Sequence, residues 1–411
     1  MTRPHPARAL PPLLALLLLP LVACSDDPPH YSYDAAADAA HGIDRILRAR
    51  ERAVRSGNED DFLRTVVADP AFEEEQTTYF ENLEQLPVGT FRYRLDRSSL
   101  ERNGDTNGYW GEVEVTLRLQ GYDVAPVRTR DRLLFQPGRG GKYRLASATD
   151  KSWEQAHLTG SQPWDIEKID VREDPGVLGI FDDQTVSDAT TVLAAVESAV
   201  DDDTEVVPVD KVPGVVVYAT SDPSYLSELA GLPGGDPEQI DALTVPVPVD
   251  MSDPDSRIAS YRVMLSEDIL GQDPESFGRL VRHELTHVLL GRRGHGAPLW
   301  LTEGIAEYVS VQPMPESERQ LPAGAMTLVA GGLSELPSDE VFSGPDARAW
   351  YAVAWWICEY VARDYSQSTL FWLLDELSGG TDPTEVLHRV LGLTSAELAQ
   401  RGAALMVSTY G

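Results

Sequence analysis

Along the first part of the chain, the spacing of hydrophobic residues changes from a helical period to a strand period. Hydrophobic residues first recur at helical intervals, which predicts helices over 43–54, 61–67 and 72–86. Hydrophobic and polar residues then alternate, which predicts strands over 91–95, 113–119, 127–135 and 142–146, separated by glycine-rich turns. Helices followed by an antiparallel meander make a small α+β domain, which we place at residues 41–160.

The order of helices and strands over 41–160 resembles the nuclear transport factor 2-like fold, in which a curved sheet wraps around helices. The resemblance is one of pattern, because no residue in this stretch carries a specific motif. It implies a concave face that could bind a small ligand. A domain appended in this way is more often a spacer or a recognition module. Ligand binding and a spacer or recognition role therefore both stay open.

The pattern restarts after residue 160, and we place a second domain at 166–411. Hydrophobic runs predict strands over 177–181, 214–218 and 258–265, with a helix over 189–200. A segment rich in Pro, Gly and Asp, 231–255, is expected to be a loop. From Glu275 onward the periodicity is mostly helical. The expected fold class is therefore α+β, with two domains in a chain of 411 residues, which is too long for one ordinary domain.

One predicted helix in the second domain carries two histidines and a glutamate in a metal-binding arrangement. Asp273 and Pro274 suit a helix start, and Gly291 suits its end. Between them, His283 and His287 are four residues apart, so both imidazoles lie on one face, one turn apart. Such a pair can bind one Zn²⁺, and Glu284 lies beside it as a candidate base. Because a five-residue pattern of this kind also arises by chance, two structural histidines remain an alternative.

The next predicted helix, within 299–308, supplies further carboxylates. A stripe of hydrophobic residues that begins at Leu301 would pack this helix on the first one. Glu303 and Glu307 lie on another stripe, where burial without a cation would cost several kcal/mol. With His283 and His287, Glu303 completes three protein ligands and leaves a fourth position for water, as in catalytic zinc sites.

The sequence His283-Glu-Leu-Thr-His287, followed by Trp-Leu-Thr-Glu303-Gly-Ile-Ala-Glu-Tyr, is similar to the gluzincin metallopeptidases. The resemblance implies that Glu303 is the third zinc ligand and that Glu307 orients His283. It also implies a transition-state donor on the helix around 351–360, for which Tyr351 is the candidate. The interval of fifteen residues between His287 and Glu303 is shorter than usual in the family, so the connecting loop must be tight.

On this resemblance the chain is a zinc metallopeptidase in which Glu284 takes a proton from metal-activated water. The strand over 259–265 would be the edge strand that pairs with a peptide substrate. The Gly-x-Met-Glu-Asn motif of the aminopeptidases is absent, which favours an endopeptidase. Tyr351 could instead be a packing residue, and His295 is a second candidate donor. A binding protein without activity and a hydrolase of non-peptide substrates are the competing functions.

The N-terminus has the features of a bacterial lipoprotein signal. Arg3 and Arg8 precede an apolar run over 9–22, whose fourteen residues span roughly 21 Å as a helix, short of the roughly 30 Å of a bilayer core. The run ends in Leu-Val-Ala-Cys24, which resembles a lipobox. We expect a signal peptide over 1–23, lipidation of Cys24, a tether over 24–40 and an extracytoplasmic protein anchored to a membrane. Cleavage without lipidation, and hence secretion, is the alternative.

The acidic composition limits the partners. The formal net charge of −32 repels nucleic acid and anionic lipid headgroups, so neither is an expected partner. A well-solvated surface is the simplest interpretation of this charge. Besides Cys24 the chain has one other cysteine, Cys358, which we expect to be a small buried hydrophobic residue.

Overall fold

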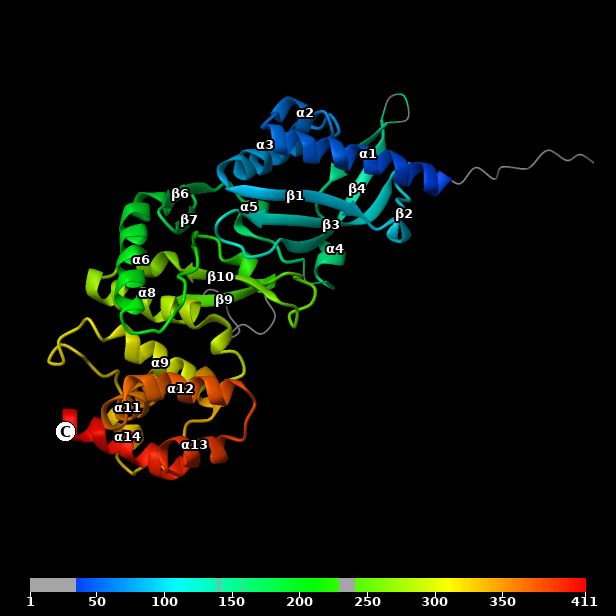
Figure 1. The fold of residues 1–411 in the computed structure, drawn as a ribbon. Coiled ribbons are helices and arrows are strands. Elements are labelled where there is room, and N and C mark those ends of the chain that lie inside the picture. Colours follow the sequence, from blue (N-terminus) through cyan, green and yellow to red (C-terminus); the bar gives the residue numbers. More distant parts are fainter. Residues whose placement is uncertain (1–34, 139, 141, 158, 229–240) are drawn as a thin grey trace, which may run out of the picture. The chain divides into compact units, whose positions relative to one another are not determined.

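The computed structural model describes residues 35–138, 140, 142–157, 159–228 and 241–411 (Figure 1). The expected signal peptide and Cys24 lie outside this part of the chain, as does most of the expected tether. Residues 36–411 form one compact unit. The first helix, α1 (Ala35–Ser56), begins earlier than expected, so the tether prediction is wrong for 35–40. The reason is local, because the alanine-rich start of α1 favours a helix.

The N-terminal part of this unit consists of helices packed on an antiparallel sheet, as expected (Figure 1). The helices are α1, α2 (Glu59–Leu63) and α3 (Pro70–Gln85). The strands are β1 (Val88–Leu95), β2 (Glu101–Arg102), β3 (Tyr109–Leu119), β4 (Val127–Pro137) and β5 (Tyr143–Ser147), in the order β1-β3-β4-β5 with β2 on β3. Ile43 and Leu47 of α1 pack with Val113 and Phe135 of the sheet, so the alternating pattern does separate a core face from an outer face.

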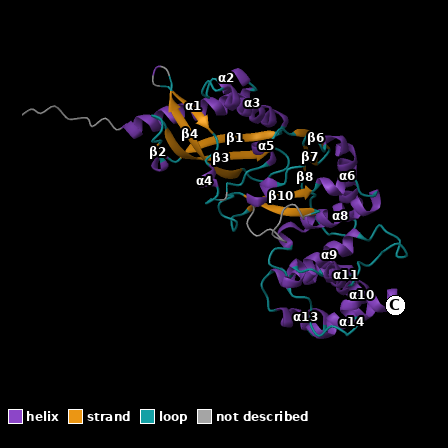
Figure 2. Cartoon of the chain, turned by 180° about the vertical axis from the view of Figure 1, so that it is seen from behind, coloured by secondary structure: helices purple, strands orange, loops and turns teal. Residues whose placement is uncertain are grey.

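A second sheet occupies the middle of the unit and is mixed rather than antiparallel (Figure 2). The short helices η1 (Arg97–Ser99), α4 (Lys151–Glu154) and α5 (Pro163–Ile166) precede it. Its strands are β6 (Asp170–Asp174), β7 (Val177–Phe181), β8 (Val215–Ala219), β9 (Ala242–Pro248) and β10 (Ile258–Leu265), in the order β6-β7-β8-β10-β9. The strands β7, β8 and β10 are parallel, and the outer strands β6 and β9 are antiparallel to their neighbours.

Strand β9 corrects two expectations. It lies within 231–255, which was expected to be a loop, because Pro246 and Pro248 are residues that strands usually exclude. An edge strand tolerates proline, since one row of its backbone groups has no partner strand. β9 pairs with β10 over 258–265, so the strand expected at the edge lies inside the sheet and β9 takes the edge.

Helices cover the second sheet, and the remainder of the chain is mainly helical. The helix α6 (Ala189–Thr204) and the short elements η3 (Val186–Asp188), η4 (Ser224–Glu228) and α7 (Glu267–Leu270) connect the strands. From residue 274 the elements are α8 (Pro274–Leu290), η6 (Gly291–Arg293), α9 (Leu299–Ser310), α10 (Ala325–Val329), η7 (Asp339–Ser343), α11 (Ala347–Asp364), α12 (Gln367–Ser378), α13 (Pro383–Leu391) and α14 (Ser395–Tyr410). The fold class is α+β.

The C-terminal helices surround a core built on α11. Trp355 and Cys358 of this helix are fully buried, as are Leu301 and Ile305 of α9. Burial also raises the pKa of the Cys358 thiol well above its usual range, which agrees with a small buried hydrophobic residue. Helix α9 is therefore fixed on one side by α11, and its other side faces α8.

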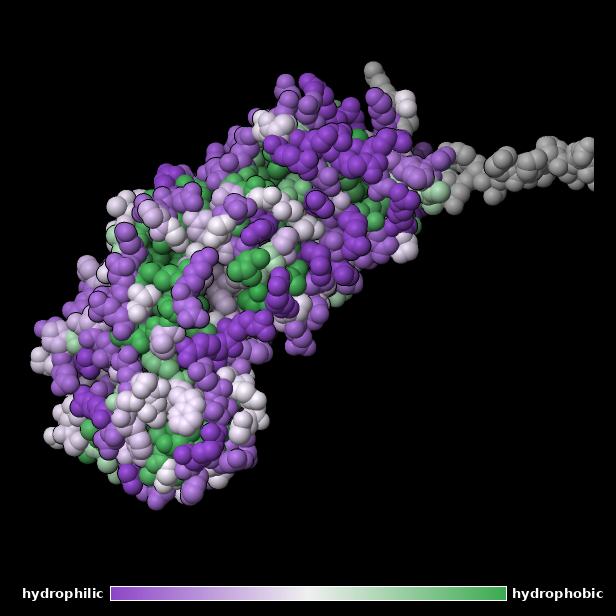
Figure 3. All heavy atoms as spheres, viewed as in Figure 1, coloured by the Kyte–Doolittle hydropathy of each residue, from purple (hydrophilic) through white to green (hydrophobic). Residues whose placement is uncertain are grey.

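The surface is hydrophilic over much of the face drawn in Figure 3, with hydrophobic residues visible between the polar ones. This matches the well-solvated surface expected for an acidic chain. None of the helices in the part of the chain that the structure describes combines the length and apolar character that a membrane span requires.

Candidate metal centre

The helix α8 carries three of the predicted site residues, and its two ends are held by local features. The Asp273 carboxylate accepts a hydrogen bond from the Ser276 amide at 3.0 Å, and Pro274 is the first helical residue. Gly291 ends the helix with φ at 49°, a left-handed backbone value that glycine adopts without strain. His283, Glu284 and His287 therefore lie in the ordered interior of the helix, as the sequence predicts.

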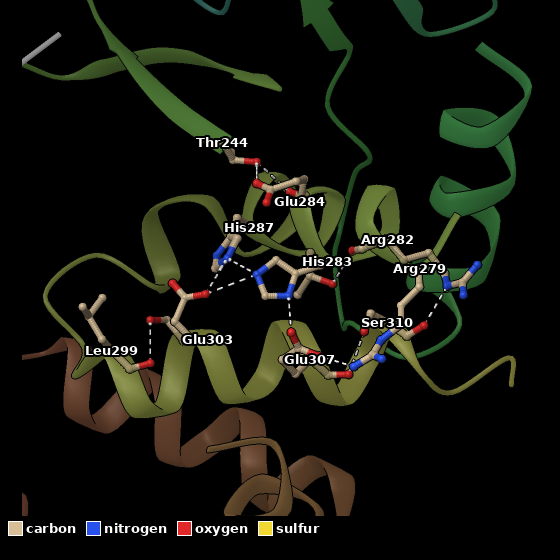
Figure 4. Close-up of polar contacts among 12 residues, drawn as sticks. Thr244, Arg279, Arg282, His283, Glu284, His287, Leu299, Glu303, Glu307 and Ser310 are labelled. Atoms are coloured by element: carbon tan, nitrogen blue, oxygen red, sulfur yellow. Dashed lines mark hydrogen bonds and ion pairs between the residues drawn. The ribbon is translucent and has the colours of Figure 1, made fainter. Parts of the chain in front are cut away.

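The helix α9 carries the two carboxylates, and a glycine allows it to pack closely against α11. A Cβ atom on Gly304 would lie 2.6 Å from the Ala354 carbonyl oxygen and 2.7 Å from the Cys358 sulfur of α11. Only glycine allows this close approach of the two helices. Glu303 and Glu307, on either side of Gly304, point away from α11 and toward α8 (Figure 4).

Three side-chain atoms converge between the two helices. The His283 Nε2 and Glu303 Oε2 atoms are 3.2 Å apart, and the His287 Nε2 atom lies 3.3 Å from each of them. These distances form a nearly equilateral triangle (Figure 4). Four ligands placed tetrahedrally at about 2.0–2.1 Å from a zinc ion are separated by about 3.3 Å. Two imidazoles and one carboxylate with these spacings fit three corners of such a tetrahedron.

The charges at the triangle also suit a cation. Burial alone would raise the pKa of Glu303, but His287 and His283 outweigh burial and hold it well below its usual value. Burial alone would lower the pKa of His283, but its hydrogen bonds to Glu303 and Glu307 raise it well above the usual range. The carboxylates thus favour a positive charge between the helices, and a divalent cation would provide it without protonation of the histidine.

Glu307 lies on the opposite side of the His283 ring from the triangle. One of its carboxylate oxygens is 3.4 Å from His283 Nδ1, and the other accepts a hydrogen bond of 2.6 Å from Arg279. Burial opposes ionisation of Glu307, but His283 and Arg279 lower its pKa to about 2. A carboxylate at Nδ1 favours the tautomer with its proton there, which leaves the lone pair of Nε2 free to bind a metal.

Glu284 points away from the triangle toward strand β9 (Figure 4). The Thr244 hydroxyl lies 2.7 Å from Glu284 Oε2 and 3.0 Å from the Glu284 carbonyl oxygen. Because both of these groups are acceptors, the hydroxyl proton is donated to them. Oε2 is the Glu284 oxygen held in this way, and within the described part of the chain Oε1 has no hydrogen-bond partner. Oε1 is therefore the oxygen available to a water molecule.

Tyr351 and His295 are placed differently from each other. The Tyr351 ring lies edge-on to His283, with 6.0 Å between ring centroids, and it also packs against Phe342. Burial and the nearby carboxylates raise the pKa of Tyr351, so its hydroxyl stays protonated and can donate a hydrogen bond. His295 is exposed in the loop before α9, and no hydrogen bond joins its side chain to the three converging atoms in the described structure. Tyr351 is thus the better-placed candidate donor.

Sequence reasoning missed Thr244 and Arg279 as residues of the site. Thr244 lies in a segment expected to be a loop, and only its pairing with β10 places it beside α8. Arg279 does carry a signal, because it precedes His283 by four residues and so lies on the same face of α8. In the structure the Arg279 guanidinium forms an ion pair with Glu307.

The residues brought together are thus His283, His287 and Glu303 at the triangle, with Glu307, Glu284 and Tyr351 around it. Cys24 lies outside the described residues. No protein-family model matches the sequence, and no curated protein shows significant similarity to it.

Proposed function

We propose that this chain is a zinc-dependent peptidase. The observation that carries the proposal is the triangle of His283 Nε2, His287 Nε2 and Glu303 Oε2, with edges of 3.2–3.3 Å. Two histidines and a carboxylate are a donor set of catalytic zinc sites, which keep a position open for water. A glutamate that follows the first histidine directly is the usual base of such sites.

The residues around the triangle can each take a separate role in amide hydrolysis. A zinc ion held there would supply Lewis acidity toward water and toward a carbonyl oxygen. Glu284, fixed at Oε2 by Thr244, would accept the proton of the attacking water at Oε1 and pass it to the leaving nitrogen. Tyr351 would donate its hydroxyl proton in a hydrogen bond to the oxyanion that develops on the substrate.

Strand β9 is the element to which an extended peptide would add. It is the outer strand of the second sheet, and its Thr244 contacts the proposed base. A peptide paired to β9 would therefore pass close to Glu284. Alternate residues of β9 direct their backbone groups outward, and the Asp241 carbonyl accepts from the Ser266 amide on the β10 side, so the outward residues are the even-numbered ones. Because Pro246 and Pro248 have no backbone N–H, β9 can donate hydrogen bonds to such a peptide only at residues 242 and 244. The proposal is of an endopeptidase that binds a short extended segment.

The lipobox-like sequence at Cys24 supports a further part of the proposal, namely export and attachment to a membrane through a lipid anchor. Stable attachment takes two or more acyl chains. Cys24→Ser is expected to release the protein from the membrane fraction into the soluble extracytoplasmic fraction, measured by immunoblotting. Retention of the variant on membranes would contradict the anchor.

The function is tested by hydrolysis of a quenched fluorescent peptide library by the zinc-loaded wild type and by Glu284→Gln. The wild type should cleave, and Glu284→Gln should be slower by about 10²–10⁴-fold, because the base is removed while the metal ligands remain. Equal rates would exclude Glu284 as the base. A wild type that binds zinc but cleaves no peptide would favour a binding protein or a hydrolase of another substrate.

A further inference from the structure

A buried ion pair joins the N-terminal helix-and-sheet part of the unit to the second sheet. Arg262 Nη2 of β10 lies 2.6 Å from Asp123 Oδ1, in the turn between β3 and β4, and both side chains are almost fully buried at 2% and 0% exposure. The Ser260 hydroxyl donates to the same Asp123 oxygen and accepts from Arg262, and the other Asp123 oxygen accepts from the Leu119 amide. Tyr218 of β8 accepts from Arg262 Nε.

A charged pair at this position needs an explanation other than stability. Arg262 lies in an inner strand of the sheet, paired with Val216 on one side and Val245 on the other. Replacing a buried ion pair with apolar residues is often neutral or stabilising, so such a pair is weak support for stability. Its best-attested use is to fix the register of one element on another.

Backbone hydrogen bonds connect the same two regions. The Val124 amide donates to the Ala259 carbonyl at 2.9 Å, and the Arg128 amide donates to the Val249 carbonyl at 3.0 Å. The Met251 amide donates to the Arg128 carbonyl at 2.9 Å, and the Arg128 side chain pairs with Asp250 at 2.9 Å. These contacts all reach the β9–β10 hairpin, residues 242–265, which ends the sheet on that side.

The β9–β10 hairpin contacts the proposed base, Glu284, through Thr244. Val263, next to Arg262 in β10, is paired with Thr244 of β9, and the Thr244 hydroxyl holds the Glu284 carboxylate. The path from Asp123 to Glu284 therefore runs through one ion pair, one strand pairing and one hydrogen bond.

From these contacts we propose that the N-terminal part is a clamp on the β9–β10 hairpin and that Asp123 is a positioning residue of the active site. By fixing β10 it sets the position of Thr244 and, through it, of Glu284. The N-terminal part is then a component of the catalytic unit rather than a spacer. The effect on catalysis rests on the peptidase proposal, whereas the clamp itself can be tested without any activity.

The test compares Asp123→Asn, Arg128→Gln and the control Arg132→Gln with the wild type in the full chain. Arg128 is partly exposed, so its variant should fold even if Asp123→Asn does not. Arg132 forms ion pairs with Glu101 and Asp150 inside the N-terminal part and makes no ion pair with the hairpin in the described structure. Hydrogen exchange measured by mass spectrometry reports the protection of β9 amides.

Asp123→Asn and Arg128→Gln should raise the exchange rate of β9 amides at least tenfold, with α11–α14 and zinc content unchanged, while Arg132→Gln matches the wild type. On a peptide that the wild type cleaves, Asp123→Asn should lower kcat by about 10–100-fold with a smaller change in KM, since misplacement by about 1 Å can cost 10²-fold.

Wild-type exchange in β9 of a folded Asp123→Asn or Arg128→Gln variant would overturn the clamp. Loss of zinc together with protection throughout the chain would also overturn it, because the role would then be general stability. A wild type without peptidase activity would remove the proposed function, yet increased exchange confined to the hairpin in the two variants would still support the clamp.

Discussion

His283, His287 and Glu303 show how far side-chain identity and spacing can predict which side chains converge. A four-residue interval on one helix fixes two imidazoles on one face, and a buried glutamate on the next helix needs a cation. The structure places their atoms at 3.2–3.3 Å from one another. Thr244 could not be predicted in the same way, because its contact with Glu284 spans forty residues and depends on strand pairing.

The hydrogen bond from Thr244 to Glu284 gives a first prediction. Thr244→Val keeps the shape of the side chain but removes its donor, so the Glu284 carboxylate should lose its fixed orientation. We expect kcat to fall about 10-fold or more with zinc content unchanged, in line with other residues that orient active-site groups. Thr244→Ser is the matched control and should stay within about threefold of the wild type. Equal kinetics for the valine variant would exclude this role.

Asp203, near the end of α6, gives a prediction about pH. Its carboxyl group is fully buried, with one oxygen bonded to the Thr286 hydroxyl and the other without a hydrogen-bond partner among the residues that the structure describes. Burial raises its pKa to about 8, against about 3.9 in an unfolded chain. The folded state therefore holds a proton that the unfolded state releases, and stability should be lost as pH rises from about 4 through about 8.

Asp203→Asn should remove that loss, because the amide stays neutral at every pH. At pH 8.5 the zinc-free variant should be more stable than the wild type by several kcal/mol, because each pH unit between the two pKa values costs the wild type about 1.4 kcal/mol. At pH 5 the difference should be small. Urea unfolding at the two pH values measures it, and a difference independent of pH would contradict the assignment.

At the scale of elements, the sequence predicts the bounds of helices and strands correctly where hydrophobic periodicity is strong. The strands over 177–181 and 258–265 have the expected bounds, and α8 begins and ends at the expected caps. The strand β9 was missed because its two prolines are strand-breaking in most contexts. Only the topology shows that β9 lies at an edge, where proline is tolerated. The helix expected over 61–67 instead covers Glu59–Leu63, because the Thr65 carbonyl and the Val67 amide hydrogen-bond to Leu145 of β5.

The packing of α9 on α11 gives a prediction at the same scale. Gly304→Ala places a methyl group against the Ala354 carbonyl and the Cys358 sulfur, at 2.6 and 2.7 Å. Since backbone atoms cannot yield easily, α9 should shift and stability should fall by about 1–3 kcal/mol. Because α9 carries Glu303, zinc affinity should fall as well. Gly271→Ala, where a Cβ meets no atom within 4 Å, is the control and should leave both quantities unchanged. Wild-type zinc affinity in Gly304→Ala would show that Glu303 does not depend on this packing.

At the scale of the whole molecule, the sequence predicted two domains, and the structure joins residues 36–411 in one compact unit. The buried pair of Asp123 and Arg262 links positions 139 residues apart. Neither residue belongs to a motif, and in sequence each is an ordinary charged residue of an acidic chain. Contacts of this kind arise from the docking of two sheets, so periodicity within one segment carries no signal for them.

The central claim is that His283, His287 and Glu303 bind one catalytic zinc ion, and calorimetric titration of the metal-stripped chain with zinc chloride tests it most directly. The wild type should bind one zinc per chain with submicromolar affinity. His287→Ala and Glu303→Ala should bind at least 100-fold more weakly, while Glu284→Gln, which keeps all three donors, should bind like the wild type. A wild-type chain that binds no zinc, or binds it equally well without His287 and Glu303, would contradict the account.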